Sequence, residues 1–212
     1  MTSYRVIPMD IYPRRAHFDY FRGMAQPYAG LTVSVEITRF LQKVRETGSP
    51  FFLSFLYCVS RAANQVPELR QRIRDGEIVE YETCCTSHTE ARPDGTYCYC
   101  VLDSGMPFSE YLPRARRAQV EARAQGSLED GEDALSLFFV SSVHWVSYDA
   151  IVQPTPFPAD TNPRITWGKY RREGERVLLP VSLLCHHALV DGLHLGRFYQ
   201  HLETELTKFP GE

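Results

Sequence analysis

Residues 176–194 read RVLLPVSLLCHHALVDGLH, an apolar run that ends in two adjacent histidines and continues into an Asp-Gly pair. The run from 176 to 185 is typical of a buried β-strand. After Asp191, apolar residues recur at helical spacing and predict an amphipathic helix: Leu195, Phe198, Tyr199, Leu202 and Leu206. The connection between this strand and this helix is therefore expected to present side chains on a loop that rigid elements hold in place.

Outward from this junction, the remaining pattern alternates between strands and helices. Residues 31–37 alternate apolar and polar side chains and predict a strand, and residues 51–66 predict a largely buried helix between two prolines. Three short strand candidates follow within 77–102, namely EIVEY, CTSHTEA and TYCYCVL. Residues 110–134 favour a solvated helix and loop, and residues 135–152 form the most strand-like stretch of the chain.

Length and composition indicate one mixed α and β domain spanning residues 1–212. Of the 212 residues, 43% are hydrophobic and 23% are charged, an ordinary globular mixture that excludes a disordered or coiled-coil chain. The net charge of −3 provides no basic footprint for nucleic acid. We therefore expect no nucleic-acid partner.

The chain also lacks the sequence marks of membranes and secretion. Its apolar runs stay well short of the roughly 20 residues that cross a bilayer, and its first ten residues are mixed rather than apolar. The six cysteines include no CxxC pair, and we interpret them as reduced thiols. A cytoplasmic protein with no membrane partner is expected.

Three of the seven histidines lie within residues 186–194 and admit three interpretations. A metal site would use His186, His187, Asp191 and His194, although adjacent histidines on a strand point to opposite faces. A purely structural role would have a histidine cap or pack against its neighbours. A general base would take a proton from a hydroxyl or thiol near neutral pH. Composition and spacing leave all three open.

A family resemblance separates them. The string HHALVDGLHLGRFYQHL, residues 186–202, resembles the His-His-x-x-x-Asp-Gly signature and following helix of the chloramphenicol acetyltransferase family. Further stretches resemble the family in the same order along the chain: YPRRAHF (12–18), the helix and its Glu-Leu-Arg sequel within 57–82, ALSLFFVSSVHWVSYDA (134–150) and RITWGKYRREGERVLLP (164–180). The resemblance thus covers nearly the whole chain.

The resemblance implies a fold, a reaction and an assembly. The implied fold is α/β, a two-layer α+β sandwich in which helices cover a mixed β-sheet. The implied reaction moves an acetyl group from acetyl-CoA, as co-substrate, to a hydroxyl of a small molecule, without a metal. The implied assembly is a homotrimer with active sites at its subunit interfaces.

The same resemblance assigns catalytic roles. His187 matches the general base, and its neighbour His186 is left with a structural role. Asp191 matches an aspartate that pairs with an arginine, here Arg14, and so holds the histidine loop. Ser141 matches the serine that hydrogen-bonds the oxyanion of the transition state. A further match is Thr166, at the position of a threonine that holds a water there.

Other matches concern binding. Trp145 and Tyr170 match aromatic positions on the coenzyme side, and Tyr20, Phe21 and Ile151 match the acceptor side. The chain departs from the family mainly in this pocket, since Ile151 and Gln153 replace a phenylalanine and a leucine. A further replacement is His144, which stands where the chloramphenicol-modifying members often carry a proline. Acetyl transfer to a hydroxyl is therefore the main prediction, and chloramphenicol is the best single acceptor.

Three other functions stay open from the residues. The first is an acetyltransferase-like trimer that acts on another hydroxyl acceptor. The second is the acyltransferase core of a dihydrolipoamide complex, disfavoured because no lipoyl domain or Pro/Ala-rich linker is seen and the acceptor would be a thiol. The third is a non-catalytic trimeric scaffold that binds a small hydrophobic ligand.

Overall fold

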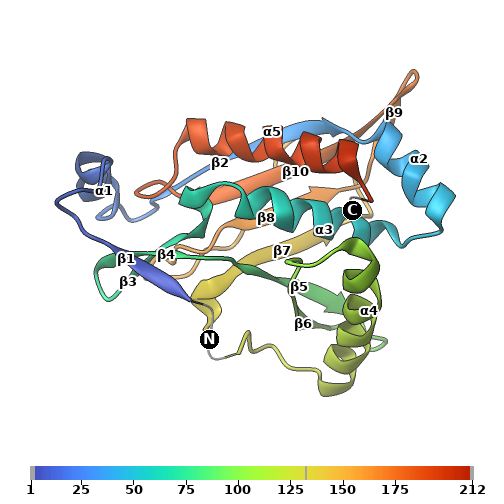
Figure 1. The fold of residues 1–212 in the computed structure, drawn as a ribbon, viewed down its shortest axis with the longest axis horizontal. Helices are drawn as coiled ribbons and strands as arrows, with labels where there is room; N and C mark the ends of the chain where they lie inside the picture. The colour runs from blue at the N-terminus through green and yellow to red at the C-terminus, as the bar shows by residue number, and fades with distance from the viewer. Residues whose placement is uncertain (1–2, 132, 211–212) are drawn as a thin grey trace.

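The fold is a mixed β-sheet with helices packed against it (Figure 1). The computed structural model describes residues 3–131 and 133–210. Its helices are α1 (Arg15–Phe21), α2 (Thr38–Thr47), α3 (Phe51–Asn64), α4 (Phe108–Gln125) and α5 (Gly192–Lys208), with short 3-10 turns η1 (Pro67–Arg70) and η2 (Ala134–Ser136). Its strands are β1 (Tyr4–Ile7), β2 (Tyr28–Glu36), β3 (Gln71–Arg74), β4 (Glu77–Tyr81), β5 (Cys85–Ala91), β6 (Tyr97–Leu102), β7 (Leu137–Val143), β8 (Arg164–Gly168), β9 (Arg171–Glu173) and β10 (Arg176–His186).

The large sheet is built around the strand that the opening sequence predicts. Its order is β2-β10-β8-β7-β5-β6, and β9 pairs with the start of β10. Strand β7 runs parallel to β8 and to β5, and the other neighbours are antiparallel. Strands β1, β4 and β3 form a separate three-stranded sheet. The predicted mixed sheet is confirmed.

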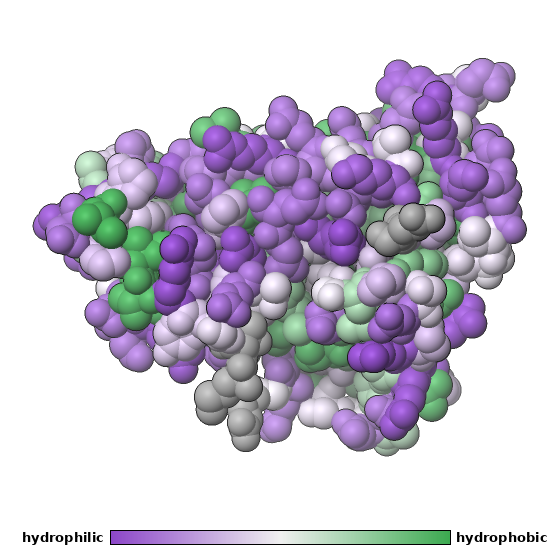
Figure 2. Space-filling view, viewed as in Figure 1, coloured by the Kyte–Doolittle hydropathy of each residue, from purple (hydrophilic) through white to green (hydrophobic). Residues whose placement is uncertain are grey.

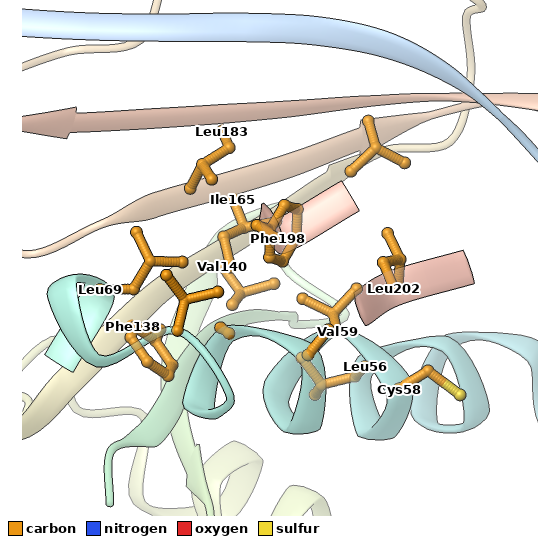
Figure 3. Packing of buried hydrophobic residues seen from close by; sticks show 14 of the residues in the cluster. Leu56, Cys58, Val59, Leu69, Phe138, Val140, Ile165, Leu183, Phe198 and Leu202 are labelled. Carbon is orange, nitrogen blue, oxygen red and sulfur yellow. The ribbon is translucent and has the colours of Figure 1, made fainter. Parts of the chain in front are cut away.

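Helices α3 and α5 cover one face of the large sheet (Figure 1). Ten of the fourteen residues of α3 are buried, as expected for a helix that lies between the sheet and other helices. Figure 3 shows the resulting core, in which side chains of both helices meet side chains of the strands: Leu56, Val59, Val140, Ile165, Phe198 and Leu202. The two-layer α/β architecture is therefore confirmed.

The predicted strand over 135–152 is wrong beyond Val143. Strand β7 ends there, and the Val146 N–H turns back to the Val143 carbonyl at 3.3 Å. Tyr148 then folds over β8, where a Cβ on Gly168 would lie only 2.8 Å from its ring. The aromatic and β-branched residues that suggested a longer strand instead pack over β8 or face solvent, because strand propensity reflects packing context.

Other boundaries differ less. The predicted helix over 51–66 is α3, which ends at Asn64, and the predicted strand over 31–37 is β2, which starts three residues earlier. Helix α2 was not predicted, although its buried residues Phe40, Leu41 and Val44 do recur at helical spacing. None of the described helices combines the length and the apolar character needed to span a membrane.

Candidate active site

His187 lies in the turn that joins β10 to α5 and is half-buried. Its backbone N–H donates to the Pro27 carbonyl at 2.7 Å, which ties the turn to the segment before β2. Its ring Nδ1 lies 2.9 Å from the Val190 carbonyl oxygen. A carbonyl oxygen only accepts hydrogen bonds, so Nδ1 carries the proton in this contact. The other nitrogen of the neutral ring, Nε2, is then the one with a free lone pair.

Aromatic stacking fixes the plane of this imidazole. The Phe21 ring stacks on the His187 ring with centroids 3.9 Å apart and an interplanar angle of 25°. Tyr20 contacts Phe21 edge-on at 4.9 Å, and its own side chain is exposed. Figure 2 shows hydrophobic residues on the surface at the end of the molecule where α1 lies. The two predicted acceptor-side aromatics therefore lie beside the predicted base.

An ion pair between Arg14 and Asp191 stabilises the turn that holds His187. Arg14 donates through Nη1 to Oδ2 of Asp191 and through Nη2 to the His187 carbonyl at 3.4 Å. Asp191 is also the N-cap of α5, since its Oδ1 accepts the Leu193 N–H at 3.0 Å. Partial burial alone would raise the pKa of the Asp191 carboxyl, but the Arg14 hydrogen bond and nearby charges lower it. The carboxylate form that this support requires is thereby favoured.

His186 differs from its neighbour in burial and in the direction of its Nδ1 hydrogen bond. It is buried, its Nδ1 accepts the Ala188 N–H at 3.2 Å, and it contacts the Tyr28 ring. It borders a cavity of about 720 Å³ whose lining includes Phe18, Met24 and Asp160. Burial lowers the pKa of His186 to about 4, so the ring is neutral at physiological pH.

The geometry does not favour the metal interpretation of these histidines. Within the described residues, no group of three or more His, Cys, Asp or Glu side chains is placed to hold a metal ion. His186 and His187 each use Nδ1 for a backbone contact, and His194 does the same with the Asp191 N–H. The histidines thus serve the local backbone separately rather than converging.

A second set of polar side chains forms a row across the sheet. Ser141 on β7 pairs with Thr166 on β8, Thr166 pairs with Ser182 on β10, and Ser182 pairs with Thr32 on β2. Cross-strand partners point to the same face of a sheet. Trp167, the neighbour of Thr166, contacts Phe52 and Phe55 of α3, so the hydroxyl row lies on the face opposite that helix.

Hydrogen bonds organise most of this hydroxyl row. Thr32 and Ser182 lie 2.7 Å apart through their hydroxyls, and Ser182 donates to the Tyr148 hydroxyl at 3.2 Å. The Tyr148 hydroxyl donates to the Thr166 carbonyl, and the Thr166 hydroxyl donates to Gln153 Oε1 at 3.2 Å. Ser141 is half-buried at the end of the row and takes no part in these bonds. Its hydroxyl is therefore available to an incoming group.

The remaining predicted binding residues lie on connections rather than on strands. The Trp145 side chain is 70% exposed and contacts only the His144 ring among the described aromatic pairs, at 4.0 Å. Tyr170 lies between β8 and β9 and approaches the Phe51 ring at 6.2 Å. Ile151 is half-buried in the loop after β7. Their exposure leaves them accessible to a large ligand.

The residues thus fall into two groups at different places along the chain of β10. Ser182 lies within β10, whereas His187 follows the end of that strand five residues later, and at about 3.3 Å per residue their backbones are roughly 16 Å apart. Sequence reasoning missed Ser182, Thr32 and Tyr148. Thr32 on β2 and Ser182 on β10 could have been found, because each is a polar residue in an otherwise apolar stretch of strand. Tyr148 carries no such signal.

The comparisons with known proteins agree on one family. The family model described as chloramphenicol acetyltransferase matches residues 2–203. A chloramphenicol acetyltransferase of a Klebsiella species is 28% identical over 220 residues, covering 100% of this chain and 97% of the relative. Chloramphenicol acetyltransferase 2 of Escherichia coli is 31% identical over 205 residues, covering 93% and 94%.

Solved structures show the same fold. A chloramphenicol acetyltransferase structure superposes with a TM-score of 0.84 at 25% identity, covering 96% of this chain and 100% of that one. A dihydrolipoamide acetyltransferase of Azotobacter vinelandii has a TM-score of 0.66 at 17% identity, covering 90% and 85%, and shares the fold alone. On these full-length matches, the chain belongs to the chloramphenicol acetyltransferase family of acyltransferases.

Proposed function

We propose that this protein transfers the acetyl group of acetyl-CoA to a hydroxyl of chloramphenicol or a closely related small molecule, with His187 as general base. The observation that carries the proposal is the contact of His187 Nδ1 with the Val190 carbonyl at 2.9 Å. It leaves Nε2 free to accept a proton on a half-exposed ring. The full-length relatives named chloramphenicol acetyltransferase support the acceptor.

The reaction follows from these positions. His187 Nε2 accepts the proton of the acceptor hydroxyl as that oxygen attacks the thioester carbonyl. Ser141 donates its hydroxyl proton in a hydrogen bond to the carbonyl oxygen as negative charge develops there. His187 then returns the proton to the departing thiolate of the coenzyme. Arg14 and Asp191 hold the turn, and Phe21 holds the plane of the imidazole.

Thr166 and the binding residues act around this centre. The Thr166 hydroxyl, already oriented by Gln153, holds a water near the transition state. Trp145 and Tyr170 contact the coenzyme, and Tyr20, Phe21 and Ile151 contact the acceptor. The polar Gln153 lies on the proposed acceptor side, near Ile151 in the sequence. It favours acceptors that carry a hydrogen-bonding group where this side chain lies.

We also propose that the site is completed between copies of the chain in a homotrimer. A single acetyl carbonyl spans only a few ångströms, whereas the backbones of His187 and of Ser182 in the hydroxyl row are roughly 16 Å apart within one chain. The family resemblance supports a trimer with shared sites. A cytoplasmic location, where acetyl-CoA is available, is part of the same proposal, and the chemistry requires no metal.

A thiol-release assay with acetyl-CoA and chloramphenicol tests the proposal. We expect release in the wild type and a loss of about 100-fold or more in kcat for Ser141→Ala, the range for an oxyanion donor. His187→Ala should lose at least as much of its kcat. The matched control is His201→Ala, a half-buried histidine on α5 outside the proposed site, which should keep wild-type activity.

Mixing the two inactive variants tests the shared site. Co-expressed His187→Ala and Ser141→Ala chains should regain activity, because some interfaces combine an intact His187 from one copy with an intact Ser141 from another. Assemblies that stay inactive, despite a measured mass near three times 24.4 kDa, would rule out the shared site. A wild type that binds chloramphenicol but releases no thiol with any hydroxyl acceptor would instead indicate the binding scaffold.

A further inference from the structure

The peptide group between Val190 and Asp191 is hydrogen-bonded at both ends to histidine side chains. Its carbonyl oxygen lies 2.9 Å from Nδ1 of His187. Its N–H donates to Nδ1 of His194 at 3.1 Å. One planar, resonance-coupled unit therefore connects the proposed base to a second imidazole on the first turn of α5.

The half-buried carboxylate of Glu68 lies on the far side of that second imidazole. Because His194 Nδ1 accepts a hydrogen bond, the proton of its neutral ring is on Nε2, which lies 3.5 Å from Oε1 of Glu68 in η1. His194 is only 5% exposed. The other carboxylate oxygen of Glu68, Oε2, is buried and finds no hydrogen-bond partner among the described residues.

We propose that His194 and Glu68 are positioning residues for His187, acting through the Val190–Asp191 peptide; this rests on the proposed function of His187 as the base. The chain of contacts runs from Glu68 to His194, through the peptide N–H and C=O, to His187 Nδ1. The Glu68 carboxylate, 3.5 Å from Nε2, polarises the His194 ring through its charge, and the two hydrogen bonds of the peptide polarise one another, so the Val190 carbonyl becomes a stronger acceptor. The stronger acceptor holds the proton of His187 on Nδ1 and leaves Nε2 free.

The groups around His194 favour its neutral form in this chain. Burial lowers the pKa of His194, and Arg14 and Arg197 act in the same direction, whereas Glu68 and Asp191 oppose it. Protonation would put a hydrogen on Nδ1, which lies 3.0 Å from Asp191 Oδ1 and would then donate to that carboxylate. The peptide N–H would lose its acceptor, and the chain to His187 would be broken.

If His194 only capped α5, its variants would change stability and leave kcat unaltered. His194→Phe keeps the ring shape and removes both nitrogens. His194→Asn places an oxygen near the position of Nδ1 and keeps the acceptor. We expect His194→Phe to lower kcat about 10- to 100-fold, as for removal of the group behind a functional imidazole, with KM within about twofold of wild type. His194→Asn should restore most of that loss, and His201→Phe on the same helix is the control.

Two further readouts separate positioning from stability. Nitrogen NMR of the histidine rings should show His187 protonated on Nδ1 in the wild type and a mixture of tautomers in His194→Phe. Glu68→Gln removes the negative end of the chain while keeping its shape. The acid limb of its kcat/KM profile should move to lower pH, because an imidazole with less negative charge behind it takes a proton less readily.

The outcomes are distinguishable. If His194→Phe lowers only the melting temperature, with the His187 tautomer and kcat unchanged, His194 is a helix cap and the inference is overturned. If that variant does not fold, the pH profile of Glu68→Gln decides, and an unshifted profile overturns it. If the tautomer of His187 depends on His194 but the wild type transfers no acetyl group, the proposed function fails and the inference about the imidazole stands.

Discussion

The turn of residues 186–191 and the loop of residues 144–163 both leave a strand of the same sheet, and both carry proposed site residues. The turn is short, and its polar groups are bonded within the chain: the His187 N–H to Pro27, the Val190 carbonyl to His187, and the Asp191 N–H to His194. The loop is long and leaves large apolar side chains in solvent, with Val152 97% and Phe157 92% exposed.

This difference indicates that the turn and the loop have different roles in the proposed site. The turn holds His187, the proposed base, in one tautomer and one plane before any ligand arrives, which is the preorganisation that catalysis needs. The loop is bonded to the sheet through Tyr148 and Gln153 but leaves Trp145 exposed and Ile151 half-buried. Exposed apolar residues in such number are typical of a surface that is covered in use, by a ligand or by another copy of the chain.

The largest effect should come from removing the ion pair of the turn. Arg14→Ala leaves the half-buried Asp191 carboxylate without its partner and the His187 carbonyl without a donor. We expect the free energy of unfolding to fall by about 3 kcal/mol and kcat to fall with it. Chemical denaturation and thiol release measure the two effects.

The neighbouring arginine provides the control for this change. Arg15 is largely exposed, and its contact with Asp19 is 3.9 Å long. Arg15→Ala should therefore cost less than about 0.5 kcal/mol. Equal effects at Arg14 and Arg15, or an unchanged melting temperature and rate for Arg14→Ala, would contradict the role given to the ion pair.

A second effect within the turn depends on pH and reaches a similar size only in acid. Folding lowers the pKa of His186 from its usual 6.5 to about 4, so between these values the unfolded chain binds a proton that the folded chain excludes. The stability from this group is complete above about pH 6.5 and falls by about 3 kcal/mol as the pH approaches 4. His186→Asn, which keeps an acceptor for the Ala188 N–H, should flatten this part of the curve of unfolding free energy against pH.

The difference between the wild type and His186→Asn isolates this effect. His194, whose pKa is also lowered, contributes equally to both curves. Loss of the Asp191 carboxylate enters at lower pH, because its pKa lies below 3.8. Parallel curves between pH 4 and 6.5 would show that His186 titrates alike in the folded and unfolded chain.

The smallest effect on stability should come from the loop. Trp145→Ala should change the free energy of unfolding by less than about 0.5 kcal/mol, because the side chain is 70% exposed. If Trp145 contacts the coenzyme, KM for acetyl-CoA should rise about tenfold, in the range of an aromatic stacking contact. Val120→Ala on α4, also exposed, should change neither quantity, and an unaltered KM in Trp145→Ala would remove that residue from the binding site.

Sequence patterns predicted the elements with the strongest periodicity. Strand β10 and helix α5 appear within a residue of their expected starts, because an apolar run and a 3.6-residue repeat each have one favourable way to bury their side chains. The stretch after Val143 was misjudged because Trp145, Val146 and Tyr148 have strand-forming side chains. Their place depends on Gly168, where the absence of a Cβ admits the Tyr148 ring.

In the proposed site, too, some residues could be predicted from the sequence and others only from the tertiary structure. The resemblance pointed to His187 and to Arg14 as the partner of Asp191, a contact that the structure contains. The alignment of Ser141 and Thr166 with Ser182 and Thr32 needed the sheet register. The contact of His194 with Glu68 joins segments 126 positions apart that have no shared local pattern.

By itself, the sequence determined the fold class, the family resemblance and the location of the imidazole at the end of a buried strand, because these depend on local periodicity and on the order of short motifs. Only the tertiary structure decided which nitrogen of His187 carries the proton, which of the two adjacent histidines is buried, and which hydroxyl side chains of four strands lie in one row. Burial, a pKa and the register of a sheet depend on atoms brought together from distant segments, and the tautomer of His187 depends on a turn conformation that no local pattern encodes.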